Sequence, residues 1–302
     1  MSKRHLVVCD LSSIETRGTY WVAGDPALER VFGAGLDAYV DFGTRLYGKL
    51  YQDLDPKQKG ISDEEKEDRK LKRQNAKPAV LGCGYGLGGG DWGLDKNGDE
   101  IKTGLWGYAE NMGTLIEKEF AYECVQKYRA AYPFVPKAWR KLENAAIEAV
   151  RTGKQQEACK MVFGCVKPRK LLYIILPSGR RLHYIRPRIE TTERWDGEFY
   201  SKLKYETQVV GKFWGHTWTW GGKLMENVVQ ALSRDVLRDA MLRAAKAGFH
   251  IVGHSHDEIL CEEEVGSSQN VALLRECMIQ RAPWAPDLPL DAEGFEDRRY
   301  HK

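Results

Sequence analysis

The segment V-V-C-D-L-S-S-I-E-T-R, residues 7–17, joins two elements of different character. Residues 5–9 form an apolar run of strand length that ends at Asp10. One of the two serines that follow can cap a helix, which we expect to extend to about Val22. The segment therefore predicts a buried strand that delivers a carboxylate to the start of a helix.

A second segment, H-S-H-D-E at residues 254–258, lies between two strand-like runs at 249–253 and 259–263. These runs predict a β-hairpin with Asp257 at its tip. Two carboxylates at strand ends can converge on a pair of divalent ions, as phosphoryl transfer requires. Each aspartate also has an ordinary interpretation, because Asp10 can be a strand-end cap and Asp257 a turn residue. The hypothesis therefore depends on the sequence between them.

That sequence contains a charged helix followed by a glycine-rich run. A capping box at residues 62–65 predicts the start of the helix, and Pro78 should kink or break it. Arg73 and Lys77 are four residues apart and share one helix face, which is either a solvated face or an anion-binding one. The run Gly82–Gly90 carries one aromatic residue, Tyr85, which can stack on a base. No Gly-Lys-Ser/Thr follows, which excludes a P-loop.

The composition indicates a globular protein of 302 residues with a net charge of +3. No apolar run is long enough to span a membrane and residues 1–20 lack a signal-peptide pattern, so we expect a cytoplasmic protein without a membrane partner. The seven cysteines form no C-x-x-C pair and are expected to be reduced thiols.

A basic window stands out from this average. Residues 158–189 contain no acidic side chain but several cations, including Arg169, Arg180 and Arg181. The window is either a fluctuation in a lysine-rich chain or a strip that contacts phosphates.

Most strands are expected in hairpins rather than in alternation with helices. Helices are expected at residues 108–132, 135–151, 225–247 and 268–281, and further strands at 171–176 and 181–185 and from there to about residue 220. This order favours an α+β fold with an antiparallel sheet over a doubly wound fold.

Together these segments resemble the A-family (DNA polymerase I type) DNA polymerases, in particular their bacteriophage branch. Asp10-Leu11-Ser12-Ser13-Ile14-Glu15-Thr16-Arg17 is similar to the first palm motif of that family, D-[YF]-S-x-I-E-x-R. Arg73, Lys77, Gly82, Tyr85 and Gly86 match its fingers motif, and His256-Asp257-Glu258 matches its third motif, H-D-E.

The resemblance implies a right-hand polymerase with an antiparallel palm sheet, mainly helical fingers and no thumb. Its expected parts are palm at 1–36, fingers at 37–165, a basic β-rich segment at 166–224 and palm again at 225–302. Because Asp10 lies so near the N-terminus, we expect either a fragment or a chain whose thumb, and possibly exonuclease, is supplied by a second polypeptide.

The resemblance also assigns roles to individual residues. Two Mg²⁺ ions would be held by Asp10, Asp257 and the carbonyl of Leu11, with Glu258 as a lesser catalytic partner. Lys77 would bind the dNTP and donate a proton to the leaving pyrophosphate. The other expected dNTP contacts are Arg73, Glu15, Tyr39, Leu81, Tyr85 and Ser13, with Glu15 excluding a ribose 2′-hydroxyl and bonding to Tyr85. The expected primer–template contacts are Gln230, Asn227, His256 and Arg17, together with the basic residues Arg169, Arg180 and Arg181.

Three departures from the family pattern bear on the nucleotide site. Ser13 replaces a Gln or Asn, Tyr39 stands where many members have a histidine, and Leu81 replaces an aromatic residue beside the sugar. None of them removes an expected metal ligand. Two other functions remain open: a non-catalytic DNA-binding subunit derived from a polymerase, and a two-metal nuclease.

Overall fold

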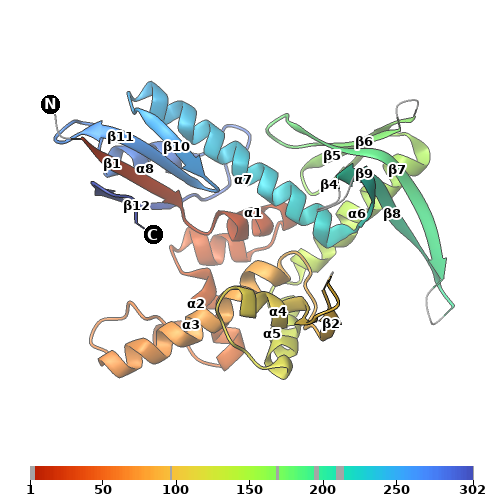
Figure 1. The fold of residues 1–302 in the computed structure, drawn as a ribbon, viewed down its shortest axis with the longest axis horizontal. Helices are drawn as coiled ribbons and strands as arrows, with labels where there is room; N and C mark the ends of the chain where they lie inside the picture. Colours follow the sequence, from red (N-terminus) through yellow and green to blue (C-terminus); the bar gives the residue numbers. More distant parts are fainter. Residues whose placement is uncertain (1–3, 96, 168–169, 194–196, 209–213, 302) are drawn as a thin grey trace.

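The structure is a computed structural model that describes residues 4–95, 97–167, 170–193, 197–208 and 214–301. A four-stranded antiparallel sheet carries the two aspartate segments (Figure 1). Its strand order is β10-β11-β1-β12, with bounds Ile251–Ser255, Glu258–Glu264, Arg4–Leu11 and Ala292–Asp297. Strand β1 is central because Val7, Val8 and Cys9 are apolar and buried. Strand β12 was not anticipated from the sequence; its acidic and mostly exposed residues suit an exposed sheet edge.

Helices α7 (Gly221–Lys246) and α8 (Val271–Ile279) pack on this sheet and on each other, and α1 (Ile14–Ala23) packs on α7. Helix α7 runs from the four-stranded sheet to the six-stranded sheet at the other side of the molecule (Figure 1). Helix α1 approaches α7 closely at Gly18, where a Cβ atom would lie 3.0 Å from Cγ1 of Val229. This close packing fixes the segment after Asp10 against the long helix.

The prediction that a serine side chain caps α1 is wrong. Ser13 occupies the N-cap position in a left-handed conformation (φ 53°) and makes no side-chain capping bond. The chain must turn sharply between the strand and the helix, which places this backbone outside the extended conformation that a capping serine adopts.

The segment expected to form the fingers contains α2 (Ala38–Tyr47), α3 (Asp63–Cys83), α4 (Gly104–Asn111) and α5 (Lys118–Ala131), with the small hairpin β2–β3 (Trp92–Leu94 and Glu100–Lys102). Two short helical turns, Leu28–Gly33 and Tyr51–Asp53, flank α2. The capping box at Ser62 and Glu65 is confirmed. The helix expected at 108–132 is instead divided between α4 and α5, with Gly113 in a left-handed conformation (φ 73°) between them.

Of the two outcomes expected at Pro78, a kink or a break, the break is wrong, because α3 continues to Cys83. A proline removes one backbone hydrogen bond, but tertiary packing can hold the helix across it. Here Ala76, Ala79, Val80 and Cys83 are all buried, and α3 packs on α2, α4 and α5. The continuous helix places Leu81 on the same element as Arg73 and Lys77.

A six-stranded antiparallel meander forms the third part of the molecule, covered on one face by α6 (Phe134–Thr152). Its strands are β4 (Gln156–Ala158), β5 (Met161–Val166), β6 (Leu171–Ile175), β7 (Arg181–Glu193), β8 (Phe199–Gln208) and β9 (Trp214–Thr219). It begins at Gln156, earlier than the expected boundary at residue 166, and the expected β6–β7 hairpin is confirmed.

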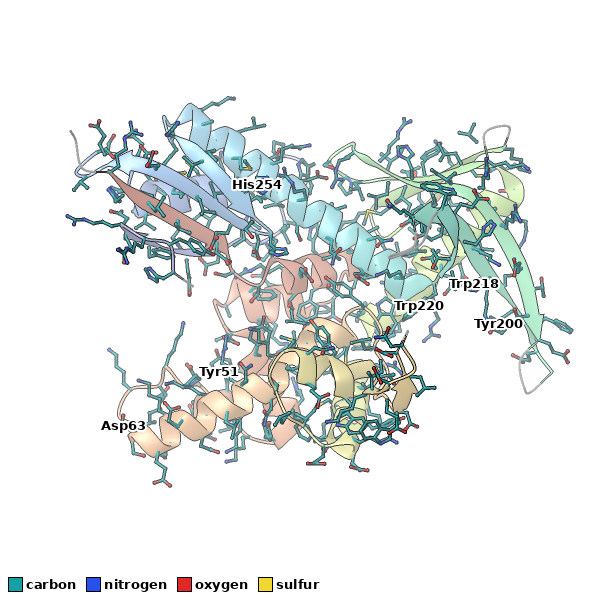
Figure 2. The ribbon with its side chains drawn as sticks, viewed as in Figure 1. Tyr51, Asp63, Tyr200, Trp218, Trp220 and His254 are labelled. Atoms are coloured by element: carbon teal, nitrogen blue, oxygen red, sulfur yellow. The ribbon has the colours of Figure 1, made fainter. Side chains whose placement is uncertain are left out.

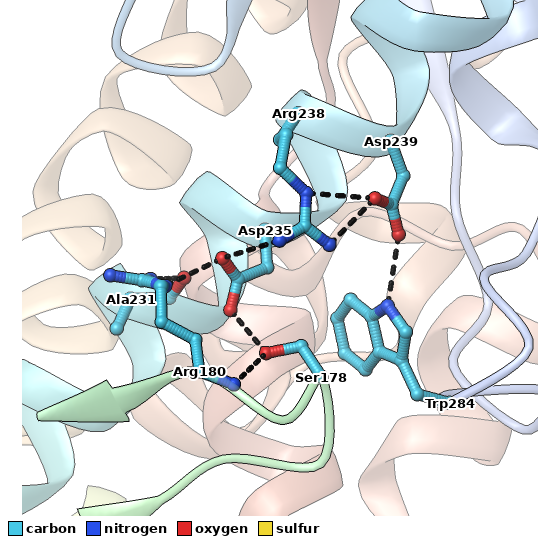
Figure 3. A network of polar contacts seen from close by, with 7 residues as sticks. All are labelled: Ser178, Arg180, Ala231, Asp235, Arg238, Asp239 and Trp284. Carbon is cyan, nitrogen blue, oxygen red and sulfur yellow. Dashed lines mark hydrogen bonds and ion pairs between the residues drawn. The ribbon is translucent and has the colours of Figure 1, made fainter.

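A polar network ties this sheet to α7 (Figure 3). The buried carboxylate of Asp235 accepts hydrogen bonds from Ser178 Oγ at 2.5 Å and from Arg180 Nε at 2.7 Å. Arg180 also donates to the carbonyl of Ala231. On the next turn Arg238 pairs with Asp239, which accepts a bond from the Trp284 indole at 2.9 Å. The turn of the β6–β7 hairpin is therefore fixed to the helix.

All seven cysteines are free thiols, as expected. Among the described residues, no helix combines the length and apolar character needed to cross a membrane.

Candidate active site

The four-stranded sheet, the segment between β1 and α1, and helix α3 line an open cleft of about 1240 Å³. The first aspartate segment contributes Asp10, Ser12 and Ser13 to its lining, and α3 contributes Arg73 and Lys77. The other lining residues come mainly from the loop before α3, the charged face of α3 and strand β12. A carboxylate therefore lies across this cleft from two cations, although 63 residues of sequence separate Asp10 from Arg73.

The two aspartate segments are neighbours in the sheet. Asp10 pairs in register with Glu258, and the backbone N–H of Leu11 donates to the carbonyl of Asp257 at 3.1 Å. Asp10 and Asp257 are both half-buried. Glu258 is almost fully buried and accepts a hydrogen bond from the Tyr300 hydroxyl at 3.1 Å. Tyr300 was missed because its position shows no motif; only the packing of the last loop brings it to the hairpin.

The donor set suits Mg²⁺, which takes oxygen ligands and needs only one or two carboxylates in addition to substrate phosphates. Within the described ranges, no group of three or more His, Cys, Asp or Glu side chains is placed to hold a metal. An aspartate at the end of β1 and another in the adjacent β10–β11 turn fit an ion that draws its other ligands from substrate and water.

Arg73 is held by a residue that sequence reasoning missed, Asp37. Oδ2 of Asp37 accepts from Arg73 Nε at 2.9 Å and lies 2.8 Å from its Nη2. Oδ1 of Asp37 accepts from the backbone N–H groups of Tyr39 and Val40, at 2.8 and 3.1 Å, and so caps α2. The Arg73 guanidinium also lies over the Tyr39 ring, 4.9 Å from its centroid. The only available signal was the position of Asp37 immediately before a helix.

Lys77 lies one turn further along α3, half-buried in the same cleft. In the part of the chain that the structure describes, no carboxylate lies within ion-pair distance of its ammonium group. Its charge is thus available to an anion in the cleft.

The predicted bond between Glu15 and Tyr85 is present, with the Tyr85 hydroxyl 2.8 Å from Glu15 Oε2. Burial, together with the Glu15 carboxylate, raises the pKa of Tyr85 well above its ordinary value. Burial likewise raises the pKa of Tyr39, whose hydroxyl is hydrogen-bonded to Ser13. Leu81 packs on the edge of the core. Four of the predicted nucleotide residues thus form two bonded pairs that link α1 to the fingers.

The residues expected to contact DNA differ in their exposure and in their partners within the fold. Gln230 and His256 are exposed, and His256 has a left-handed backbone (φ 50°) at the hairpin turn. Asn227 donates to the Tyr184 hydroxyl at 3.0 Å. Arg181 is exposed beside the Tyr173 ring, whereas Arg169 lies outside the described residues.

Two arginines are engaged within the fold, which argues against the DNA contacts expected of them. Arg17 is almost fully buried, donates to the carbonyls of Ser12 and Pro289, and lies over the Phe32 ring. Burial lowers the pKa of its guanidinium to about 10. Arg180 is paired with Asp235. The sequence does not show which arginines make contacts within the fold and which are available to DNA, because residue type does not indicate burial or pairing.

No family model matches the chain. The chain is 34% identical over 297 residues to a DNA polymerase of Bacillus phage SP02, and the match covers 98% of the chain and 41% of that protein. Among solved structures, it is similar to the polymerase domain of Pol1 from M. smegmatis in complex with DNA primer-template and dNTP. That match has a TM-score of 0.56 and 19% identity, and it covers 97% of the chain and 39% of its neighbour.

The chain therefore spans about two fifths of each of these longer proteins. The match to the solved structure shows a shared fold alone, because the sequence identity is low. The match to the phage polymerase is a similarity of sequence. The chain is thus similar in sequence to part of a phage DNA polymerase and in fold to part of a polymerase domain.

Proposed function

We propose that the chain carries the catalytic site of a template-directed DNA polymerase. The observation that supports this most strongly is the position of Asp10 at the end of β1, beside the turn that carries Asp257, in a cleft that is also lined by Arg73 and Lys77. A nuclease has no use for a cationic fingers helix, and a DNA-binding scaffold needs neither aspartate. Primer–template DNA and dNTPs, which the mycobacterial neighbour binds, are the proposed substrates.

Asp10, Asp257 and the Leu11 carbonyl would hold two Mg²⁺ ions. Bound Mg²⁺ supplies charge neutralisation at the attacking and leaving oxygens. Arg73 and Lys77 orient the triphosphate from the α3 side of the cleft. The primer 3′-oxygen forms a bond to the α-phosphorus, the bond to the bridging oxygen breaks, and Lys77 gives a proton to the departing pyrophosphate.

Glu15 and Tyr85 complete the nucleotide site. Their hydrogen bond places a carboxylate and an aromatic ring at the junction of α1 and the fingers. Glu15 lies beneath the sugar and excludes a 2′-hydroxyl, while Tyr85 occupies the templating position until the fingers close. Gln230 contacts the nascent base pair in the minor groove, where the acceptor positions of different pairs are similar. Asn227 and His256 contact the primer–template beside it.

A primer-extension assay with dNTPs and Mg²⁺ tests the proposal. Extension should be lost in Asp10→Ala and in Asp257→Ala, and should persist in Glu100→Gln, an exposed carboxylate on the fingers hairpin. Extension that survives loss of both aspartates would overturn the proposal. Degradation of the primer would instead identify a nuclease, and binding without either reaction a non-catalytic subunit.

A second polypeptide that supplies a thumb, and possibly an exonuclease, is part of the same proposal, as is action in the cytoplasm of an infected bacterium. Repeating the extension assay with and without candidate partner chains tests the first point. Long products that appear only with a second protein would support a split enzyme, and equally long products from the chain alone would contradict it.

A further inference from the structure

The outer face of the six-stranded sheet carries exposed aromatic rings with lysines between them. On β8, Lys202 and Lys204 lie on one face by strand alternation, and β9 places Trp218 opposite Lys204 in register. The Lys204 ammonium lies 4.8 Å from the Trp218 ring centroid. Lys202 lies 5.0 Å from the Tyr200 ring and 5.5 Å from that of Trp218. We call these four residues the aromatic-lysine face.

This face is open to solvent in the structure. Trp218 is 43% exposed and Tyr200 39%, and Trp214, which lies further along β9 on the same strand face, is 56% exposed. Residues two apart on a strand are separated by roughly 7 Å, so the rings on this face of β9 line up along the strand. Buried apolar side chains such as Leu203 occupy the opposite face, against α6. The rings are therefore not part of the core of the sheet.

The charges of the face favour an anion. Its two carboxylates are already engaged: Glu190 bonds to Lys204, and Glu206 is paired with Arg186 and lies 4.0 Å from Arg188. Lys202 has no ion-pair partner among the residues that the structure describes. Four cations and two paired carboxylates leave a net positive surface around planar rings. Rings that stack on bases, beside cations that contact phosphates, are the two elements of a single-strand platform.

The face is also continuous with the nucleotide site. In Figure 2, Tyr200 and Trp218 lie on the sheet, and Trp220 lies beside them on the side of helices α4 and α5. The Trp220 ring fits against Gly86 and Gly222, where an added Cβ would lie 2.3 Å from its Cη2 atom in each case. The same Cβ at Gly222 would lie 2.3 Å from the carbonyl of Tyr85. A strand that follows these rings thus reaches the Tyr85 segment.

We propose that the aromatic-lysine face, with Trp220, binds the single-stranded template and guides it to Tyr85. The inference rests on the proposed polymerase function for the identity of the strand. The binding itself depends only on base stacking and on the attraction between lysines and phosphates, so it can be measured without nucleotides.

The test is the binding of fluorescent dT20 to the whole chain, followed by anisotropy. The double variant Trp218→Ala with Tyr200→Ala should bind about tenfold more weakly, because base–aromatic stacking contributes substantially to binding. Phe199→Ala is the matched control, since Phe199 is 70% exposed on the same strand but points to the other face. It should bind as the wild type does, and Trp218→Phe should retain most of the affinity.

Lys202→Gln with Lys204→Gln provides a second test that leaves the rings in place. The slope of log affinity against log salt should become shallower by about 0.7 for each phosphate that the variant no longer neutralises. Binding of dT20 within twofold of the wild type in both double variants would overturn the inference. If dT20 binds through this face but no primer is ever extended, the polymerase proposal fails alone. If primers are extended but the variants bind dT20 normally, this inference fails alone.

Discussion

The carboxylate of Asp37 serves two elements at once: one oxygen caps helix α2 and the other holds the guanidinium of Arg73 on α3. The distance from Asp37 Oδ2 to Arg73 Nη2 is 2.8 Å, and both side chains are about one-third exposed. A triphosphate that binds Arg73 must therefore share it with a resident carboxylate. This relationship leads to the first prediction.

Asp37→Asn should lower the KM for dNTP about fivefold, since removing a nearby negative charge contributes about 1 kcal/mol to anion binding. Asparagine still caps a helix, so stability should change little. Asp37→Ala removes the cap as well and should lower the free energy of unfolding by about 1 kcal/mol. Steady-state kinetics and urea unfolding separate the two effects. A KM that rises in Asp37→Asn would show that Asp37 orients Arg73 rather than competing for it.

Tyr85→Phe should weaken discrimination between dNTPs and rNTPs. The variant keeps the ring but removes the hydroxyl that donates to Glu15 at 2.8 Å. A hydrogen bond to a charged group contributes about 1.5–3 kcal/mol, so Glu15 should become less well positioned and discrimination should fall about tenfold. The measurement is the ratio of kcat/KM for the two nucleotides. Tyr108→Phe is a control on the neighbouring helix, and unchanged discrimination in Tyr85→Phe would contradict the prediction.

Asp235→Ala should be strongly destabilising. Asp235 is 1% exposed and accepts from both Ser178 and Arg180, so its removal leaves a charge and a hydroxyl without their acceptor. The change should lower the free energy of unfolding by about 2–3 kcal/mol, because Asp235 is buried whereas Arg180 is partly exposed and its charge can be solvated. Arg238→Ala, on the exposed side of the same helix, should cost less than about 1 kcal/mol. Equal midpoints of urea unfolding for the two variants would show that the network does not hold the hairpin.

Stability should decline in alkaline solution. Burial raises the pKa of the thiols of Cys9, Cys124 and Cys261 from 9 to about 12. Above pH 9 the unfolded chain releases these protons while the folded chain keeps them. The contribution of these thiols to the free energy of unfolding is therefore fully present below pH 9 and is lost as the pH rises toward 12. Each thiol should lower the free energy of unfolding by about 1.4 kcal/mol at about pH 10.

Urea unfolding at about pH 7, 8.5 and 10 measures this decline. Cys261→Ala should flatten the dependence more than Cys165→Ala, because Cys165 is only half-buried. An unfolding free energy that is the same at the two higher pH values would exclude the thiols as its source.

Helices and hairpins whose ends are marked by neighbouring residues could be predicted from the sequence. The capping box at Ser62 opens α3, the β6–β7 hairpin forms across residues 177–179, and α7 extends over the expected helical stretch. The two failures have separate causes. Helix α3 continues past Pro78 because its buried face packs on neighbouring helices. The region 108–132 is divided between two helices because the chain turns at Gly113.

Motifs and spacing were enough to predict the candidate site residues: two aspartates in their motifs, two cations four residues apart, and a tyrosine after a glycine. The neighbours of these residues became visible only in the folded chain. Folding placed Asp10 in register with Glu258, paired Arg73 with Asp37, buried Arg17 and paired Arg180 with Asp235. Contacts between distant segments depend on how buried surfaces pack, which no local pattern of residues encodes.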